Sequence, residues 1–195
     1  MVSHKHKFIF IHIPKTGGTS VQKTLMNNAN IKRADFTKHE HLHRDLLSKT
    51  TFGHEALPHK LKSYFSFCFV RNPWEKIVSQ YHFNRHWFGM QNYKFDEYVF
   101  AFKRGRRVSA KNPYFLPWIT DEKGNVIVDF IGRYENIQED FNTICDKIGI
   151  PQQQLPHKNK TKHKHYTEYY EDETRQIVAQ KYAKDIDYFG YEFGE

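Results

Sequence analysis

Residues 13–20 combine the side chains and glycines suited to holding an anion. The run reads Ile-Pro-Lys-Thr-Gly-Gly-Thr-Ser, so that Lys15 precedes the pair Gly17 and Gly18. Two glycines let the backbone approach an anion closely, and a helix starting here would offer its N–H groups and positive dipole end. The order differs from the Walker A pattern, in which lysine follows the glycines. A junction whose Gly and Thr serve only as turn and cap is the alternative, and the combined Lys15, glycine pair and hydroxyls favour anion binding.

A second candidate anion site follows the apolar run that ends at Val70. Arg71 comes first, then Asn-Pro-Trp, and Ser79 stands eight residues after the arginine. A guanidinium binds phosphate through two parallel hydrogen bonds, and a serine two turns into the next helix can add a hydroxyl. An arginine at a strand end also often pairs with a carboxylate. This motif is more significant together with residues 13–20. Both are expected at the carboxyl ends of strands in one sheet, where ligands bind in open α/β folds.

Histidine accepts protons near neutrality because its usual pKa is about 6.5. His54 in a Gly-His pair at the end of a possible short strand is a candidate base, and Glu55 beside it is a second. A hydrogen-bonded loop histidine and an exposed glutamate are the alternatives. The histidines within residues 39–43 do not have the His-Glu-x-x-His spacing of a zinc site. We therefore expect no metal.

The elements that must position these residues follow from apolar patterning. Nearly continuous apolar runs predict strands covered on both faces at residues 7–13, 64–70 and 126–131, with a possible short strand at 50–52. Helices are expected after Gly18, after Pro73, and over 94–103, 137–148 and 177–186, with a loop at 104–124. This alternation indicates an α/β fold with a parallel sheet, and the 195 residues fit one domain, residues 1–195.

Composition narrows the class of protein. Lys and Arg number 30 against 22 Asp and Glu, and the net charge of +8 suggests either an anionic partner or a solvated basic surface. Cys68 and Cys145 lie in apolar segments and predict buried, reduced thiols. No run approaches the roughly 20 apolar residues of a membrane helix, so we expect a cytoplasmic protein without an integral membrane segment. The basic residues 103–107 stand among aromatics, which suggests a groove for an acidic sugar.

Together the motifs resemble those of the sulfotransferases that use 3′-phosphoadenosine 5′-phosphosulfate. The similarity is greatest to the carbohydrate branch containing the uronosyl 2-O-sulfotransferases and their small prokaryotic relatives. Residues 13–20 resemble the 5′-phosphosulfate loop, residues 71–79 the 3′-phosphate motif with its Arg-to-Ser spacing, and residues 131–141 a later segment that starts a core helix. The three occur in the family's order. The resemblance implies a P-loop-like three-layer sandwich, with helices flanking a central parallel sheet.

The resemblance also implies roles for individual residues. Lys15 would contact the oxygen that bridges phosphate and sulfur, and His54 would be the general base. The residues implied to hold the 5′-phosphate are Thr16, Gly17, Gly18, Thr19 and Ser20. Those implied to hold the 3′-phosphate are Arg71 and Ser79. A loop that closes over the nucleotide is implied to contain Lys158, Asn159 and Lys160.

The predicted reaction moves a sulfuryl group from 3′-phosphoadenosine 5′-phosphosulfate to a hydroxyl, with adenosine 3′,5′-bisphosphate as product. The expected acceptor is an acidic or neutral saccharide. A P-loop-type kinase of a small molecule is one alternative, but Walker A order and a clear metal-binding aspartate are missing from the sequence. A basic nucleic-acid-binding module is the other, and steeply salt-dependent binding would mark it.

Overall fold

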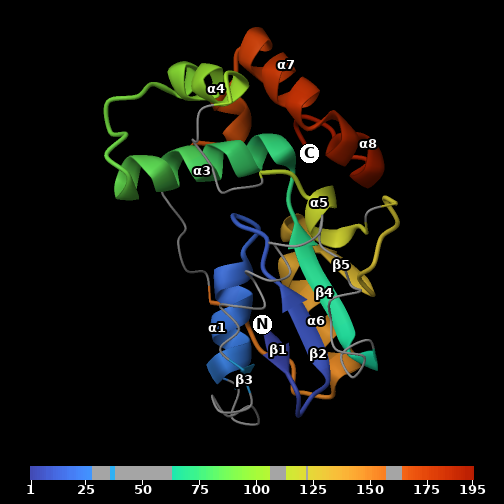
Figure 1. Cartoon of the computed structure of the whole chain (residues 1–195). Coiled ribbons are helices and arrows are strands. Elements are labelled where there is room, and N and C mark those ends of the chain that lie inside the picture. The colour runs from blue at the N-terminus through green and yellow to red at the C-terminus, as the bar shows by residue number, and fades with distance from the viewer. Residues whose placement is uncertain (28–35, 38–62, 106–112, 122, 157–163) are drawn as a thin grey trace. The chain divides into compact units, whose positions relative to one another are not determined.

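A computed structural model describes residues 1–27, 36–37, 63–105, 113–121, 123–156 and 164–195. The chain forms two compact units, each made of two separate stretches of sequence. The first unit contains residues 1–70 and 115–158, and the second contains residues 71–114 and 159–195. Figure 1 shows the helices of each unit. The first unit has strands with α1 (Gly18–Asn27), α5 (Leu116–Ile119) and α6 (Ile137–Ile148). The second has α3 (Pro73–Trp87), α4 (Phe95–Lys103), α7 (Asp172–Lys181) and α8 (Ala183–Phe189).

The first unit is built on a five-stranded sheet with the order β3-β1-β2-β4-β5. The strands are β1 (Val2–Ser3), β2 (Phe8–Ile11), β3 (Phe36–Thr37), β4 (Phe65–Val70) and β5 (Phe130–Arg133). β4 runs parallel to both β2 and β5, whereas β1 is antiparallel to β2 and to β3. The predicted α/β class is therefore confirmed. The sheet is mixed rather than wholly parallel, because the short strand β1 runs antiparallel to its neighbours β2 and β3.

One face of this sheet is lined with phenylalanine. Phe10 of β2 lies opposite Phe67 of β4, and their rings stack with centroids 5.1 Å apart. Side chains alternate between the faces of a strand, so Phe8 and Phe69 point to the same side. Helices α1 (Gly18–Asn27) and α6 (Ile137–Ile148) both pack on this face, through the buried side chains Val21, Leu25, Phe141, Ile144, Cys145 and Ile148. This core fixes where β2 and β4 end.

The strand predicted at residues 126–131 begins later than expected. Val126 instead forms an isolated antiparallel bridge with Thr120. Asp129 then fixes the start of β5, because its carboxylate accepts hydrogen bonds of 2.7 Å from both the N–H and the hydroxyl of Ser66 on β4. The predicted loop before it also contains a short helix, α5 (Leu116–Ile119). A side-chain anchor therefore sets this boundary.

The second unit consists of helices packed around buried tyrosines. Its elements are α3 (Pro73–Trp87), α4 (Phe95–Lys103), the 3-10 turn η5 (Tyr166–Tyr169), α7 (Asp172–Lys181) and α8 (Ala183–Phe189). Helix α4 packs on α7, and α3 contacts α4, α7 and η5. The helix predicted over 177–186 is interrupted at Tyr182, a fully buried residue whose N–H still bonds to Val178 O. The remaining helix predictions for this unit are confirmed.

Lys76 of α3 is a buried cation within the second unit. Its ammonium donates to the carbonyl of Pro113 and, over 3.3 Å, to the hydroxyl of Tyr182. Burial lowers the pKa of Lys76 to about 7, and nearby Asp185 acts in the opposite direction. Two hydrogen bonds and one carboxylate thus compensate in part for the loss of solvation.

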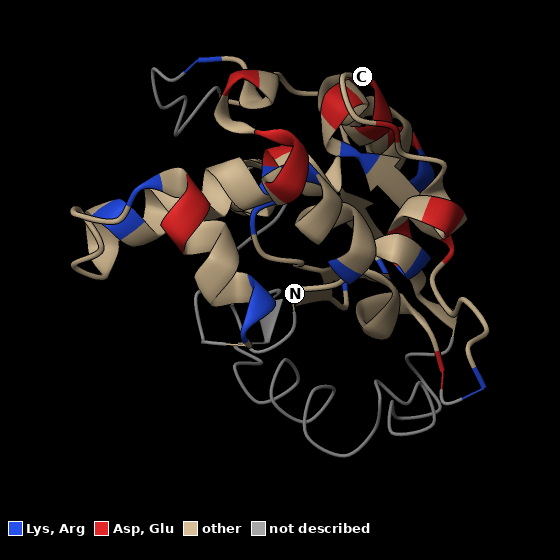
Figure 2. Ribbon diagram, turned by 90° about the horizontal axis from the view of Figure 1, so that it is seen from above, with Lys and Arg blue, Asp and Glu red and all other residues tan. Residues whose placement is uncertain are grey.

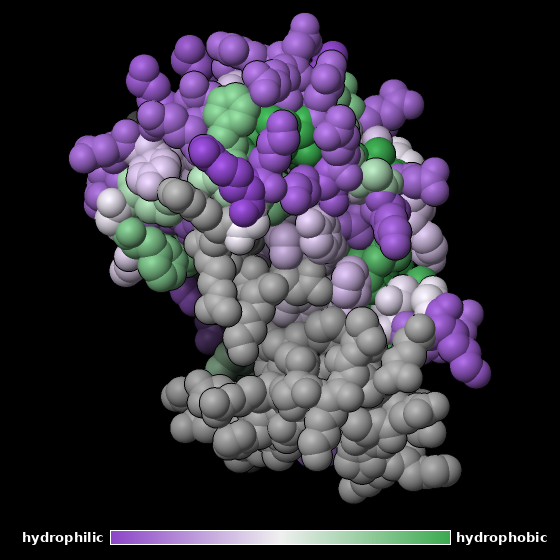
Figure 3. Space-filling model, turned by 45° about the horizontal axis from the view of Figure 1, so that its top comes forward, coloured by the Kyte–Doolittle hydropathy of each residue, from purple (hydrophilic) through white to green (hydrophobic). Residues whose placement is uncertain are grey.

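The burial of the two cysteines agrees with the prediction from the sequence. Cys68 and Cys145 are free and buried, as predicted, and burial raises the pKa of the Cys145 thiol to about 11. Figure 2 shows that both signs of charge are spread over the helices rather than separated by sign. The coloured part of the face in Figure 3 is mainly hydrophilic, with smaller hydrophobic patches. Among the described helices, none has the length and apolar character needed to cross a bilayer.

Candidate functional site

The loop after β2 has two residues with left-handed backbone conformation just before a helix begins. Lys15 and Gly17 both have positive φ, at +71° and +78°. A non-glycine residue at positive φ costs roughly 1–3 kcal/mol, and such residues concentrate at ligand sites. The Thr16 hydroxyl donates to Ile13 O over 2.9 Å and closes the turn. Helix α1 follows at once, with no acidic side chain in its first turn to neutralise its positive end.

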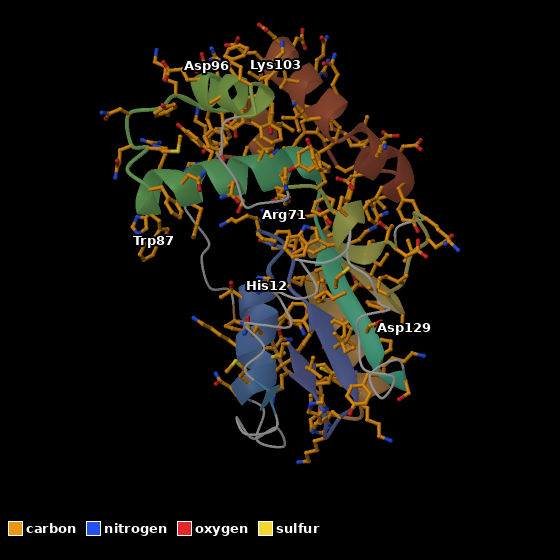
Figure 4. All side chains as sticks on the ribbon, in the orientation of Figure 1. His12, Arg71, Trp87, Asp96, Lys103 and Asp129 are labelled. Atoms are coloured by element: carbon orange, nitrogen blue, oxygen red, sulfur yellow. The ribbon has the colours of Figure 1, made fainter. Side chains whose placement is uncertain are left out.

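Both glycines of this loop are required by close neighbours. A β-carbon on Gly17 would lie 2.4 Å from Cδ1 of Ile137 and 3.0 Å from the Tyr134 ring. A β-carbon on Gly18 would lie 2.3 Å from the ring of His12, which stacks on Phe10. Figure 4 shows His12 at the N-terminal end of α1. The glycines therefore admit neighbouring side chains in addition to bending the backbone.

Residues 131–141 form the wall against which this loop packs. The 3-10 turn η4 (Tyr134–Asn136) leads into α6 and carries Tyr134 to Gly17. Asp140 accepts a 2.6 Å hydrogen bond from the Arg133 N–H, which ties the first turns of α6 back to the end of β5. Gly132 allows the Phe69 ring to approach, since a β-carbon there would lie 2.5 Å from it. The third sequence motif thus supports the first.

A Gly17→Ala substitution tests this packing. Gly149→Ala is a matched control in the same unit, because Gly149 has a φ of +69° and a β-carbon added there would meet no atom within 4 Å. We expect Gly149→Ala to lower the free energy of unfolding by about 1–2 kcal/mol through backbone strain alone. Gly17→Ala should lose about 1–3 kcal/mol more, because the new methyl group meets Ile137. Urea unfolding of both variants measures the difference, and equal losses would contradict the contact.

Arg71, the first residue of the second unit, holds a carboxylate. Its Nε and Nη2 donate to the two oxygens of Glu75 over 3.1 and 2.7 Å. Arg71 is 6% exposed, so this ion pair is largely shielded from water. The alternative weighed for an arginine at a strand end, pairing with a carboxylate, is therefore present. The pair holds the guanidinium in one orientation.

Helix α3 places Ser79 one turn beyond Glu75. Asn72 caps this helix, because its Oδ1 accepts a 3.1 Å hydrogen bond from the Trp74 N–H, and Pro73 follows at the first helical position. Positions four apart share a helix face, so Glu75 and Ser79 are neighbours on α3. The cap and the helix therefore position Arg71, Glu75 and Ser79 within one unit.

Several predicted site residues lie outside the described part of the chain. These are His54, Glu55, the histidines of residues 39–43, and Lys158, Asn159 and Lys160. Their roles stay predictions. Within the described ranges, no group of three His, Cys, Asp or Glu side chains is placed to hold a metal ion.

The structure adds neighbours that sequence reasoning did not select. His12 precedes the loop by only a few residues, and its position just after a buried strand was a usable signal. Ile137 approaches Gly17 from 120 residues away, and Asn72 donates to the carbonyl of Glu192 over a similar separation. No local pattern reports such contacts.

Comparison with known proteins identifies the family. The sequence model of the Sulfotransferase family matches residues 1–192, and the chain belongs to this family. The resemblance inferred from the three motifs is thereby confirmed at the level of the family. No solved structure is significantly similar.

Curated relatives include carbohydrate sulfotransferases. Carbohydrate sulfotransferase 14 of Danio rerio is 24% identical over an alignment of 233 residues in length. This alignment covers 98% of this chain and 61% of the relative. The mouse protein of the same name is 26% identical over an alignment of 184 residues in length, which covers 77% of this chain and 46% of the relative. An uncharacterized protein of Archaeoglobus fulgidus is 42% identical over 92 residues, covering 46% of this chain and 72% of its own. The matches thus span 46–61% of the length of these two carbohydrate sulfotransferases.

Proposed function

We propose that this protein transfers a sulfuryl group from 3′-phosphoadenosine 5′-phosphosulfate to a hydroxyl of a saccharide. The observation that carries the proposal is the loop of residues 13–20 in a member of the sulfotransferase family. It combines a lysine at positive φ, two glycines that other side chains oblige to be glycine, and a helix start without a carboxylate. These features suit a doubly charged phosphosulfate.

In this proposal the loop holds the 5′ end of the donor. The residues assigned to the 5′-phosphate are Thr16, Gly17, Gly18, Thr19 and Ser20. Thr16 contributes through its backbone, because its hydroxyl donates to Ile13 O. Lys15 is assigned to the oxygen between phosphorus and sulfur. Negative charge grows on that oxygen as the bond to sulfur breaks, and a fixed ammonium stabilises it.

Arg71 and Ser79 are assigned to the 3′-phosphate. The Arg71 guanidinium is buried and oriented, and Ser79 lies one turn beyond its partner Glu75. Lys158, Asn159 and Lys160 are assigned to a loop over the nucleotide, on position and charge in the sequence. Arg71 and Ser79 would favour a nucleotide that carries a phosphate at the 3′ position.

The proposed chemistry is an in-line displacement at sulfur. The acceptor oxygen forms a bond to sulfur, the bond from sulfur to the bridging oxygen breaks, and adenosine 3′,5′-bisphosphate leaves. His54 takes the proton that the acceptor hydroxyl loses. A sulfuryl group carries less charge than a phosphoryl group, so fixed cations suffice and the proposed reaction needs no metal. The relatives named carbohydrate sulfotransferases support a carbohydrate acceptor, and the net charge of +8 suits an acidic one.

Nucleotide titration tests this function directly. We expect adenosine 3′,5′-bisphosphate to bind at least about tenfold more tightly than AMP, because only the bisphosphate engages Arg71 through a charge-assisted hydrogen bond. Isothermal titration with the bisphosphate, AMP and ATP, each with and without chelator, measures the preference. Equal affinity for AMP, or tightest binding of magnesium-ATP, would reject the proposed donor and favour a kinase.

A further inference from the structure

Asn72 links the Arg71 turn to the far end of the chain. It is 1% exposed, and its side chain uses both polar atoms. Oδ1 accepts from the Trp74 N–H and caps α3, while Nδ2 donates over 2.8 Å to the carbonyl oxygen of Glu192. The residue next to Arg71 is thus held between its own helix and a segment 120 residues later.

Tyr166 closes the same connection. Its hydroxyl accepts a 2.7 Å hydrogen bond from the Gly194 N–H and donates over 3.1 Å to the carbonyl of Glu195. Nδ2 of Asn72 lies 3.5 Å from this hydroxyl. We call residues 192–195 the C-terminal tail. Its backbone is bonded at three places to two buried side chains, so the tail has a defined path past the Arg71 turn.

Phe193 supplies the apolar part of this arrangement. Its ring meets Trp74, Tyr166 and Tyr170 edge-on, with centroids 5.6, 5.7 and 5.5 Å away. Trp74 is held further, because its indole N–H donates to Arg175 O and its carbonyl accepts from the Tyr170 hydroxyl. Edge-to-face aromatic pairs contribute about 0.5–1.5 kcal/mol each beyond burial. The tail therefore braces the first turn of α3 with both polar and apolar contacts.

We propose that the C-terminal tail positions Arg71 for recognition of the 3′-phosphate. The inference rests on the proposed function. Arg71 adjoins Asn72, and its guanidinium is held by Glu75 on the helix that Asn72 caps. The tail fixes that cap and the Trp74 beside it. Without the tail, the turn can relax and the guanidinium loses its alignment. Tail residues act through Arg71, so a weakened tail should lower only the binding affinity that the 3′-phosphate contributes.

The ratio of the affinity for adenosine 3′,5′-bisphosphate to the affinity for AMP separates this role from general support of the fold. In Phe193→Ala, affinity for adenosine 3′,5′-bisphosphate should fall about tenfold, the value of one weakened charge-assisted hydrogen bond. Affinity for AMP, which lacks the 3′-phosphate, should change by less than about twofold. In an Arg71→Ala background, Phe193→Ala should have no further effect on bisphosphate affinity, because the residue it positions is gone.

Two more variants keep the test decisive. Tyr166→Phe removes only the hydroxyl that holds residues 194 and 195, and should lower the same ratio in a protein with a normal unfolding curve. Tyr188→Ala removes a ring that is 52% exposed on α8 and should leave the ratio unchanged.

The outcomes distinguish the tail's role from the proposed function. The role of the tail would be overturned if the ratio of bisphosphate to AMP affinity were unchanged in both Phe193→Ala and Tyr166→Phe, including the case in which both nucleotides lose affinity equally. A wild-type protein that does not prefer the bisphosphate would instead overturn the proposed function.

Discussion

A Lys15→Ala variant is expected to lose about two to three powers of ten in kcat and about tenfold in affinity for the sulfuryl donor. The ammonium contacts the donor in the ground state and meets additional charge in the transition state, so both constants change. Alanine keeps a β-carbon at the same positive φ, so the backbone strain of this position is retained. Steady-state kinetics with labelled donor and titration with adenosine 3′,5′-bisphosphate measure the two effects.

Lys23→Ala is the matched control for Lys15→Ala. Lys23 lies on α1, eight residues after Lys15, and its side chain is exposed. Its removal changes the net charge by the same amount without removing a loop cation. If both variants lose activity equally, the effect of Lys15→Ala reflects overall charge, and the assigned role of Lys15 is wrong.

His54→Ala is expected to lower kcat by about two to four powers of ten, the usual contribution of a general base. Nucleotide affinity should be nearly unchanged, because the proposed base touches the acceptor and not the donor. Only neutral imidazole accepts a proton, so the wild-type rate should fall as the pH drops below about 6.5. That acid limb should disappear in His54→Ala. Rates measured from pH 5 to pH 9 in both proteins test the assignment.

Glu55→Gln accompanies this experiment as the neighbouring control. It removes the second candidate base while keeping a side chain of similar size. Near-normal turnover in folded His54→Ala would reject His54, and a large loss in Glu55→Gln would then identify the base. Loss in neither variant would direct the search to the histidines of residues 39–43.

Local patterns were sufficient to predict most elements of both units. Continuous apolar runs identified β2 and β4, since strands covered by helices contain few polar residues. The apolar stripe of α6 and its closing Gly149, which adopts φ +69°, identified that helix and its end. The loop of residues 13–20 was recognisable as a candidate anion site because its lysine, glycines and hydroxyls are consecutive in sequence, and anion binding there stays a prediction.

Long-range contacts set the features that were missed. The start of β5 depends on the Asp129 carboxylate binding Ser66, which no hydrophobic pattern shows. The antiparallel β1 has only two residues and carries no alternation to detect. The need for Gly17 comes as much from Ile137, 120 residues away, as from the local turn. Residues far apart in sequence make these contacts, so only the folded chain shows them.

The hydrogen bond from Asn72 to Glu192 also has a consequence for the order in which parts of the chain acquire their contacts during synthesis. Residues 71–79 are synthesised more than a hundred residues before the tail that braces them. Helices form locally within microseconds, so α3 can form early in synthesis. Its cap and the ring of Trp74 stay without their late partners until residues 192–195 emerge. In the proposed function, recognition of the 3′-phosphate at Arg71 would therefore be acquired only after residues 192–195 have been synthesised, when most of the core has had time to form.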